Sequence, residues 1–157
     1  MTMTDSAAPT ATPNATVVNG TIAATSDGSN PPNYSFAYGG DCYNPQSQSY
    51  DFRHVNGPIQ LNLTLNAGTT GLNFQTDSNN DGGDAVQFMR SKDYPNGSWS
   101  LGSTFDGNPF DDFTLSGSVL GFTDKNSNGH NYHFCCLFTD ANGNKVQTDP
   151  QIMNKGG

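Results

Sequence analysis

The chain has 157 residues and a formal net charge of −8, which arises from only 14 acidic and 6 basic side chains. Every acidic residue is aspartate, and Asn, Gly, Thr, Ser and Phe take the place of strong helix formers, which excludes a mainly helical fold. The basic residues are few, and only Arg90 and Lys92 lie close together, so nucleic acid and anionic membranes are disfavoured as partners.

Residues 1–14 are rich in Thr, Ala and Pro, which predicts a flexible N-terminal arm before a folded domain at 15–157. The first residues show no basic segment followed by an apolar run, and no stretch has the length of a transmembrane helix. We therefore expect a cytoplasmic protein, with export by a route that needs no cleaved signal as the alternative.

Short apolar segments separated by turn residues follow in chain order. The clearest lies at 58–66, where Ile59, Leu61, Leu63 and Leu65 alternate with polar residues as in a strand with one buried face. Residues 39–56 are expected to be a long polar connection, and 94–112 a loop-rich segment over one end of the core. Strands are predicted at 16–25, 33–38, 58–66, 71–76, 85–90, 113–123 with a bend at Gly117, 132–138 and 144–148.

Such a series of about seven to nine short strands is typical of an all-β, single-domain antiparallel β-sandwich, with a barrel as the alternative. The last two predicted strands form a hairpin, because Asn142-Gly143 between them favours the positive φ of a tight turn. Pro150 then ends the ladder, since it has no N–H to donate.

The closing segment also carries a resemblance to known proteins. Its pattern is Tyr132-x-Phe134, Asp140-x-x-Gly143-Asn144 and Asp149-Pro150-x-Ile152-x-Asn154. It is similar to the C-terminal end of small bacterial proteins of the DP-EP type and, more loosely, to inclusion-body proteins of the PixA/AidA group. The resemblance implies an immunoglobulin-like sandwich, and it brings no catalytic residues.

Two loops resemble the start of a calcium-binding loop, in which oxygen ligands alternate along the chain and a glycine allows a sharp turn. The first would use Asp77, Asn79, Asp81 and Asp84 as metal ligands, although Phe88 stands where a bidentate Glu is usual. The second begins Asp124-Lys125-Asn126. Ordinary β-turns use the same residue types, so a plain turn is the competing interpretation of both loops.

A transition-metal site is a weaker hypothesis. His133 and Cys135 share one face of a predicted strand, but Cys42 and His54 would have to converge on them to complete four ligands. We instead interpret Cys42, Cys135 and Cys136 as buried free thiols, because adjacent cysteines on a strand point to opposite faces.

Tyrosines and a tryptophan could instead stack on sugars, although alternating aromatic residues are more often core. The candidates for stacking are Tyr34, Tyr38, Tyr43, Tyr50, Tyr94 and Trp99. No nucleophile with an oriented base is visible, so we do not expect an enzyme.

These observations predict a non-enzymatic β-sandwich for interaction or self-assembly, with no cofactor required. The expected partner is a protein, including a second copy bound through an open sheet edge or through the N-terminal arm. In the latter version the strand-prone Thr16-Val17-Val18 would supply an added strand. A calcium- or carbohydrate-binding module is the alternative.

Overall fold

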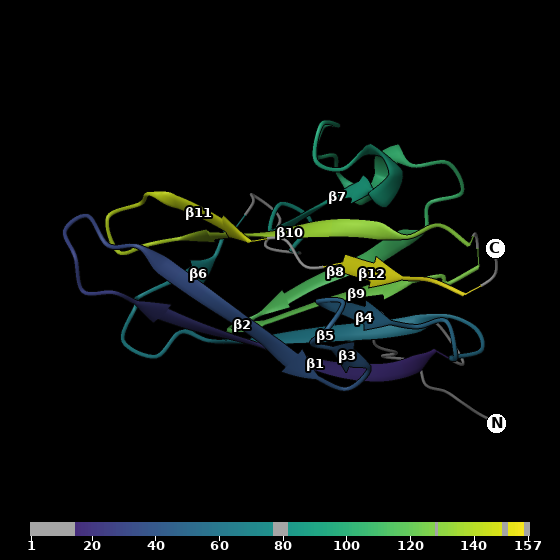
Figure 1. Ribbon diagram of the computed structural model, residues 1–157, viewed down its shortest axis with the longest axis horizontal. Coiled ribbons are helices and arrows are strands. Elements are labelled where there is room, and N and C mark those ends of the chain that lie inside the picture. Colours follow the sequence, from purple (N-terminus) through teal and green to yellow (C-terminus); the bar gives the residue numbers. More distant parts are fainter. Residues whose placement is uncertain (1–14, 77–81, 128, 149–150, 156–157) are drawn as a thin grey trace, which may run out of the picture.

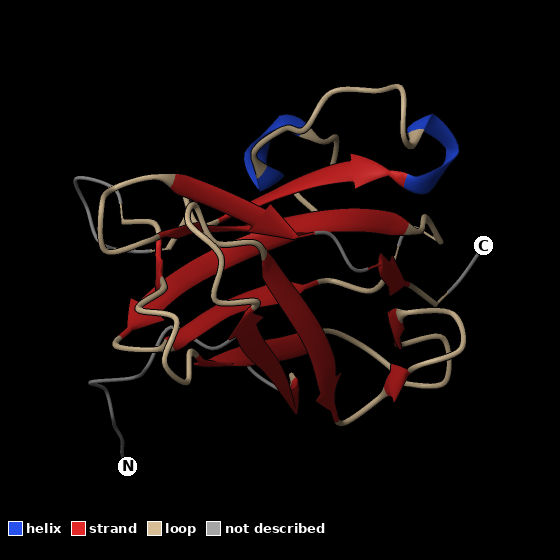
Figure 2. Ribbon diagram, turned by 60° about the vertical axis from the view of Figure 1, so that its left-hand side comes forward, coloured by secondary structure: helices blue, strands red, loops and turns tan. Residues whose placement is uncertain are grey.

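Twelve short strands in two sheets make up the fold seen in the computed structural model (Figure 1), which describes residues 15–76, 82–127, 129–148 and 151–155. The sheets pack face to face, so the all-β, sandwich-like architecture predicted from the alternating pattern is confirmed. The described helices are two short 3₁₀ turns, Ser91–Asp93 and Gly102–Thr104, at the rim of the sheets (Figure 2). No helix among the described residues is long and apolar enough to cross a membrane.

Sheet A has the strand order β2-β1-β5-β9-β8. Its pairings are antiparallel except for β1 with β5, which run parallel, so the sheet is mixed. The strands are β1 (Thr16–Ser26), β2 (Tyr34–Gly40), β5 (Ile59–Asn66), β8 (Phe110–Ser116) and β9 (Val119–Asp124).

Sheet B is organised around β10. Strands β11 and β12 pair with different parts of one side of β10, and β6 and β7 pair along its other side. From β12 the sheet continues through β4 to β3. The pairing of β12 with β4 is parallel. The strands are β3 (Tyr43–Asn44), β4 (Ser49–Asp51), β6 (Asn73–Phe74), β7 (Val86–Arg90), β10 (Tyr132–Thr139), β11 (Lys145–Thr148) and β12 (Gln151–Met153).

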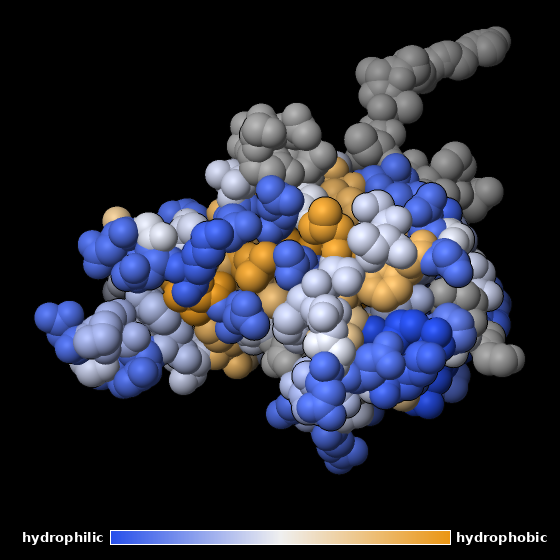
Figure 3. All heavy atoms as spheres, turned by 90° about the horizontal axis from the view of Figure 1, so that it is seen from above, coloured by the Kyte–Doolittle hydropathy of each residue, from blue (hydrophilic) through white to orange (hydrophobic). Residues whose placement is uncertain are grey.

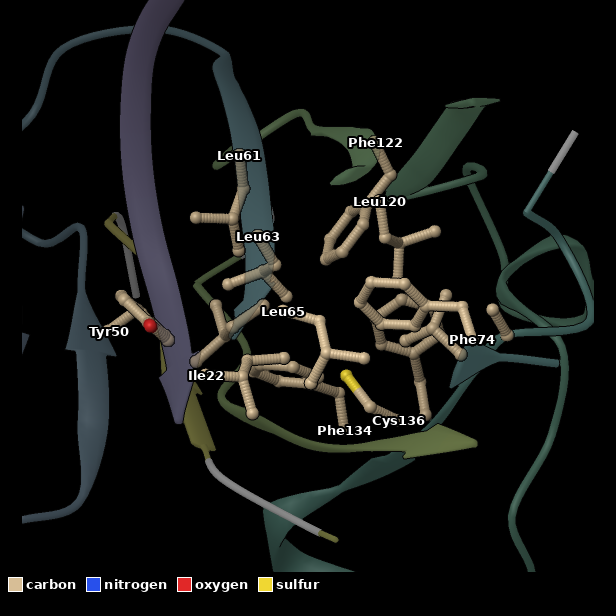
Figure 4. Close-up of a cluster of buried hydrophobic side chains, with 14 of the residues drawn as sticks. Ile22, Tyr50, Leu61, Leu63, Leu65, Phe74, Leu120, Phe122, Phe134 and Cys136 are labelled. Atoms are coloured by element: carbon tan, nitrogen blue, oxygen red, sulfur yellow. The ribbon is translucent and has the colours of Figure 1, made fainter. Parts of the chain in front are cut away.

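The core lies between the sheets and follows from the alternation along the strands. Figure 4 shows Leu61, Leu63 and Leu65 of β5 pointing into the same layer as Phe134 and Cys136 of β10. Aromatic rings fill much of this layer. Phe88 and Phe110 stack with their centroids 3.9 Å apart, which joins β7 to β8 across the sandwich.

Four sequence-based predictions need correction. The sandwich is not purely antiparallel as predicted, because β1 pairs in parallel with β5 and β12 in parallel with β4, so both sheets are mixed. The segment 113–123 is not one bent strand, because Gly117 adopts φ +58° and turns the chain so that Ser116 pairs with Val119 in a β8–β9 hairpin. The connection 39–56 contains β3 and β4, and β12 follows the closing hairpin. Cys42 is exposed, whereas Cys135 and Cys136 are buried and not in a disulfide, as expected.

Residues 1–14 lie outside the described residues, but the strand-prone segment that follows them belongs to β1. Thr16, Val17 and Val18 pair in parallel with Ile59, Gln60 and Leu61 of β5. This segment is therefore a part of sheet A in its own chain and does not extend outward as an additional strand.

Candidate functional site

The first predicted calcium loop is only partly described. Asp77, Asn79 and Asp81 lie outside the described residues, whereas Asp84 is half-buried and its backbone carbonyl accepts a hydrogen bond from Gln75 Nε2 at 3.1 Å. Phe88, at the position of the usual bidentate ligand, is a fully buried core residue. The calcium site at this loop remains a prediction.

In the second predicted calcium loop, the side chains of Asp124 and Asn126 are buried in the protein. The Asn126 side-chain amide donates to the carbonyls of Phe52, Val55 and Gly57 at 2.9–3.2 Å, and its Oδ1 accepts from the Lys155 backbone N–H. Asn126 adopts φ +54°, a conformation that Asn tolerates better than most residues. Asn126 therefore joins two segments that are distant in sequence, residues 52–57 and Lys155, at one end of the sandwich.

Asp124 begins this loop and is fully buried. One carboxylate oxygen accepts the Asn126 backbone N–H at 2.9 Å, while Oδ2 has no hydrogen-bond partner in the described part of the chain. Burial raises the pKa of Asp124 to about 7, and the nearby amides of Asn126 and Asn154 oppose that rise. The carboxyl group is thus neutral over much of the acidic range.

The other predicted ligand residues do not converge. No three His, Cys, Asp or Glu side chains come together among residues 15–76, 82–127, 129–148 and 151–155. His133 instead stacks against Tyr94 with ring centroids 3.7 Å apart, on the outer face of β10. The surface on this side of the molecule is mainly hydrophilic, with apolar side chains gathered near its centre (Figure 3).

The aromatic residues proposed for sugar stacking are divided between several places. Tyr50 is fully buried, and its hydroxyl donates to the Gly39 carbonyl at 2.8 Å. Tyr94 and Trp99 pack edge to face with centroids 6.3 Å apart. Tyr38 and Tyr43 share a surface groove, where their rings stack with centroids 6.4 Å apart.

The edges of the sheets differ in how well they are protected from pairing with another chain. Edge strand β8 carries Asp111 and Asp112, and a register shift interrupts its ladder between Asp111 and Thr114. Charges and bulges of this kind prevent edge-to-edge association. In sheet B, β3 has two residues and is followed by Pro45, while β11 has four residues and begins with Lys145.

Edge strand β2 has none of these protective features. It consists of seven residues, Tyr-Ser-Phe-Ala-Tyr-Gly-Gly, without a charged side chain or a proline, and its pairing with β1 is regular over the whole length. A long, uncharged and regular edge is the kind that pairs readily with an additional strand.

The hydrogen bonds at both ends of the β1–β2 ladder show which backbone groups of β2 face outward. Asp27 N donates to Asn33 O and Asp41 N donates to Asn19 O, both at 3.0 Å. Because bonded and non-bonded pairs alternate, the odd-numbered residues of β2 bond to β1. The backbone N–H and C=O groups of the even-numbered residues therefore point away from β1 and have no hydrogen-bond partner in the described part of the chain. These even-numbered residues are Tyr34, Phe36, Tyr38 and Gly40.

A groove of about 320 Å³ runs beside this edge and separates it from β3 and β11. Its lining has aromatic rings and amide or hydroxyl groups but no charged side chain. Burial raises the pKa of the Tyr38 hydroxyl well above its ordinary value, so this group is neutral at physiological pH. The lining residues are Phe36, Ala37, Tyr38, Tyr43, Pro45, Gln48 and Thr148.

Sequence reasoning did identify Tyr34, Tyr38 and Tyr43 as aromatic candidates, but it did not identify β2 as an edge. The lack of charge and proline in Tyr34–Gly40 was the available signal. In comparisons with known proteins, no family model and no curated protein matches this chain.

Proposed function

We propose that this protein is a non-enzymatic interaction module that self-assembles by pairing β2 with β2 of a second copy. The observation that carries the proposal is that edge strand β2 is long and uncharged, whereas edge strand β8 carries two aspartates and edge strand β11 is short and begins with a lysine. The immunoglobulin-like topology implied by the resemblance stays a prediction.

A symmetric antiparallel pairing suits the backbone of β2. Ala37 is the central residue of Tyr34–Gly40. If two copies of β2 pair about Ala37, Phe36 faces Tyr38 and Tyr34 faces Gly40, and these are the residues with outward backbone groups. Two-fold symmetry of this kind is the commonest arrangement of soluble homo-oligomers.

Burial of the aromatic groove beside β2 would supply the apolar contribution to the free energy of association. Backbone hydrogen bonds that replace bonds to water contribute only about 0.5–1.5 kcal/mol each, so added burial must favour association. Phe36 and Tyr43 are partly buried in the monomer and line the groove, where a second copy would cover them further. A net charge of −8 on each copy opposes association.

The test is the mass of the full chain by light scattering and sedimentation over a range of concentrations. In the symmetric register Ala37 faces its own copy at about 4.5 Å, so Ala37→Glu places like charges together. We expect this variant to weaken association by about tenfold or more. The matched control is Thr64→Glu, which adds the same charge at an exposed position of the central strand β5.

Two results would count against the proposal. One is a wild-type chain that stays monomeric at about millimolar concentration. The other is an equal loss of association in Ala37→Glu and Thr64→Glu, which would indicate a general charge effect.

Carbohydrate binding is the second candidate, because the groove is aromatic-lined and has no charged side chain. Neutral oligosaccharides are the suitable probes. Saturable binding that Tyr43→Ala abolishes, without any change in the mass of wild-type protein with concentration, would favour this candidate over self-assembly. Calcium binding stays a prediction, to be tested by thermal unfolding with and without the ion.

A further inference from the structure

A second cavity lies where the C-terminal end of β7 and the N-terminal end of β10 meet the segment after Gly102–Thr104. Its volume is about 340 Å³, within the range of small-molecule sites. The proposed pairing through β2 does not involve it. The cavity is lined by Arg90, Thr104, Phe105, Asp106, His130 and Tyr132.

Arg90 is the last residue of β7 and brings a half-buried cation to this cavity. Its Nη2 lies 2.9 Å from His130 Nδ1. The guanidinium has only N–H donors, so it donates in this contact and His130 Nδ1 accepts. The contact orients the guanidinium but does not supply a carboxylate for it.

No carboxylate pairs with Arg90 in the described part of the chain. The ion pairs there are Arg53 with Asp51 and Lys125 with Asp111. The Arg90 Nε is also buried and has no hydrogen-bond partner among the described residues. A partly buried guanidinium of this kind gains from a ligand carboxylate, which matches its planar donors.

The remaining lining restricts which carboxylate would fit. Asp106 is exposed at the rim and would repel a second negative charge, while it could receive a ligand ammonium group. Phe105 and Tyr132 pack edge to face at 5.4 Å and provide an apolar wall. The overall charge of −8 likewise disfavours a polyanion.

From these contacts we propose that the cavity binds a small zwitterion of the α-amino acid class. The carboxylate would lie at Arg90, the ammonium group at Asp106, and the apolar part against Phe105 and Tyr132. A ligand with both charges is expected to bind better than one with either charge alone, because each charge meets an opposite one.

Calorimetric titration of the full chain with the free L-amino acids tests this assignment, with acetate and methylammonium as single-charge controls. At least one amino acid should bind saturably at about millimolar concentration or below, and about tenfold more tightly than either control. Arg90→Gln should abolish this binding. Asp106→Asn should weaken it by about tenfold while leaving the deaminated carboxylate of the same ligand unaffected.

The matched controls are Arg53→Gln, at an exposed arginine held by Asp51, and Asp93→Asn, at an exposed aspartate of the neighbouring loop. Neither should change the titration. If Arg90→Gln does not fold, Asp106→Asn at its exposed position decides the question. The assignment is overturned if no amino acid binds the wild-type protein, or if Asp106→Asn binds amino acids as tightly as wild type.

Discussion

The two edges of sheet A, β2 and β8, have equal lengths of seven residues but opposite chemistry. Strand β8 has two adjacent aspartates, a positive φ at Asp112 and an interrupted ladder, and Lys125 Nζ lies 3.8 Å from the Asp111 carboxylate. Strand β2 has a regular ladder and no charge. This difference between the two edges is the reason why we propose β2, and not β8, as the edge that pairs with a second copy.

The end of β2 depends on the backbone conformation of a glycine. Gly40, the last residue of β2, has φ +103°, and the chain then crosses to β3 in sheet B. An added Cβ at Gly40 would overlap the backbone carbonyl oxygen of Asn19. The edge and its groove therefore depend on a glycine at this position.

The largest expected effect is that of breaking this geometry. Gly40→Ala combines a strained φ with a backbone overlap, so we expect a loss of about 3 kcal/mol in the free energy of unfolding, measured with urea. Gly28→Ala is the control, because Gly28 has φ +76° but no atom within 4 Å of an added Cβ. It should cost about 1 kcal/mol. Equal losses in the two variants would show that the overlap at Asn19 has no influence.

A smaller effect on the free energy of unfolding is expected from the ionisation of Asp124, a residue of β9 that pairs with Phe110 of the edge strand β8. The pKa of the buried Asp124 carboxyl is about 7, above its ordinary value of 3.8. The folded state therefore retains a proton that the unfolded state releases. This contribution to stability is complete below about pH 4 and is lost as the pH rises through 7.

Asp124→Asn keeps a neutral group of the same shape and should remove that dependence. We expect wild-type protein to lose on the order of 2 kcal/mol more than Asp124→Asn between about pH 4 and pH 8, in urea unfolding at each pH. Asp27 and Asp140 act in the opposite sense, because hydrogen bonds from Ser29, Asn33 and Asn144 lower their carboxyl pKa values. The comparison of wild type with the variant cancels these contributions. Parallel pH profiles would contradict the assignment.

The smallest effect is expected from removing the charges that protect β8. In the Ala37→Glu background, Asp111→Asn with Asp112→Asn should raise self-association by about threefold, because the ladder interruption still limits pairing. Asn also tolerates the positive φ of Asp112. Asp93→Asn with Asp106→Asn removes two charges elsewhere and serves as the control in sedimentation. No difference between the two pairs would mean that the aspartates do not protect this edge.

Much of the fold could be predicted because one-sided burial leaves a period of two in the sequence. The alternation of Ile59, Leu61, Leu63 and Leu65 predicted β5 to within one residue, and the closing hairpin around Asn142-Gly143 is confirmed. By contrast, Gly117 was compatible with both a bend and a reversal, and only the pairing of Ser116 with Val119 distinguishes them. The parallel pairing of β1 with β5 is set by contacts between distant segments, which no local pattern reports.

The candidate sites were less predictable because they depend on which segments meet. Asn126 belongs to a calcium-like motif, but its amide binds carbonyls about 70 residues away in sequence. Arg90 and His130 are separated by 40 residues, and nothing in their local sequences connects them. The exposure of the β2 edge likewise requires the strand order, which periodicity does not determine.

The pairing of β2 is tested most directly by residue-level amide hydrogen exchange at low and high protein concentration. We predict that the amides of Phe36 and Tyr38, which face outward, become protected as concentration rises. The amides of Ser35 and Ala37 should not change, because they already bond to β1. Exchange at Phe36 and Tyr38 that is independent of concentration, in protein that does form dimers, would contradict the assignment of β2 as the interface.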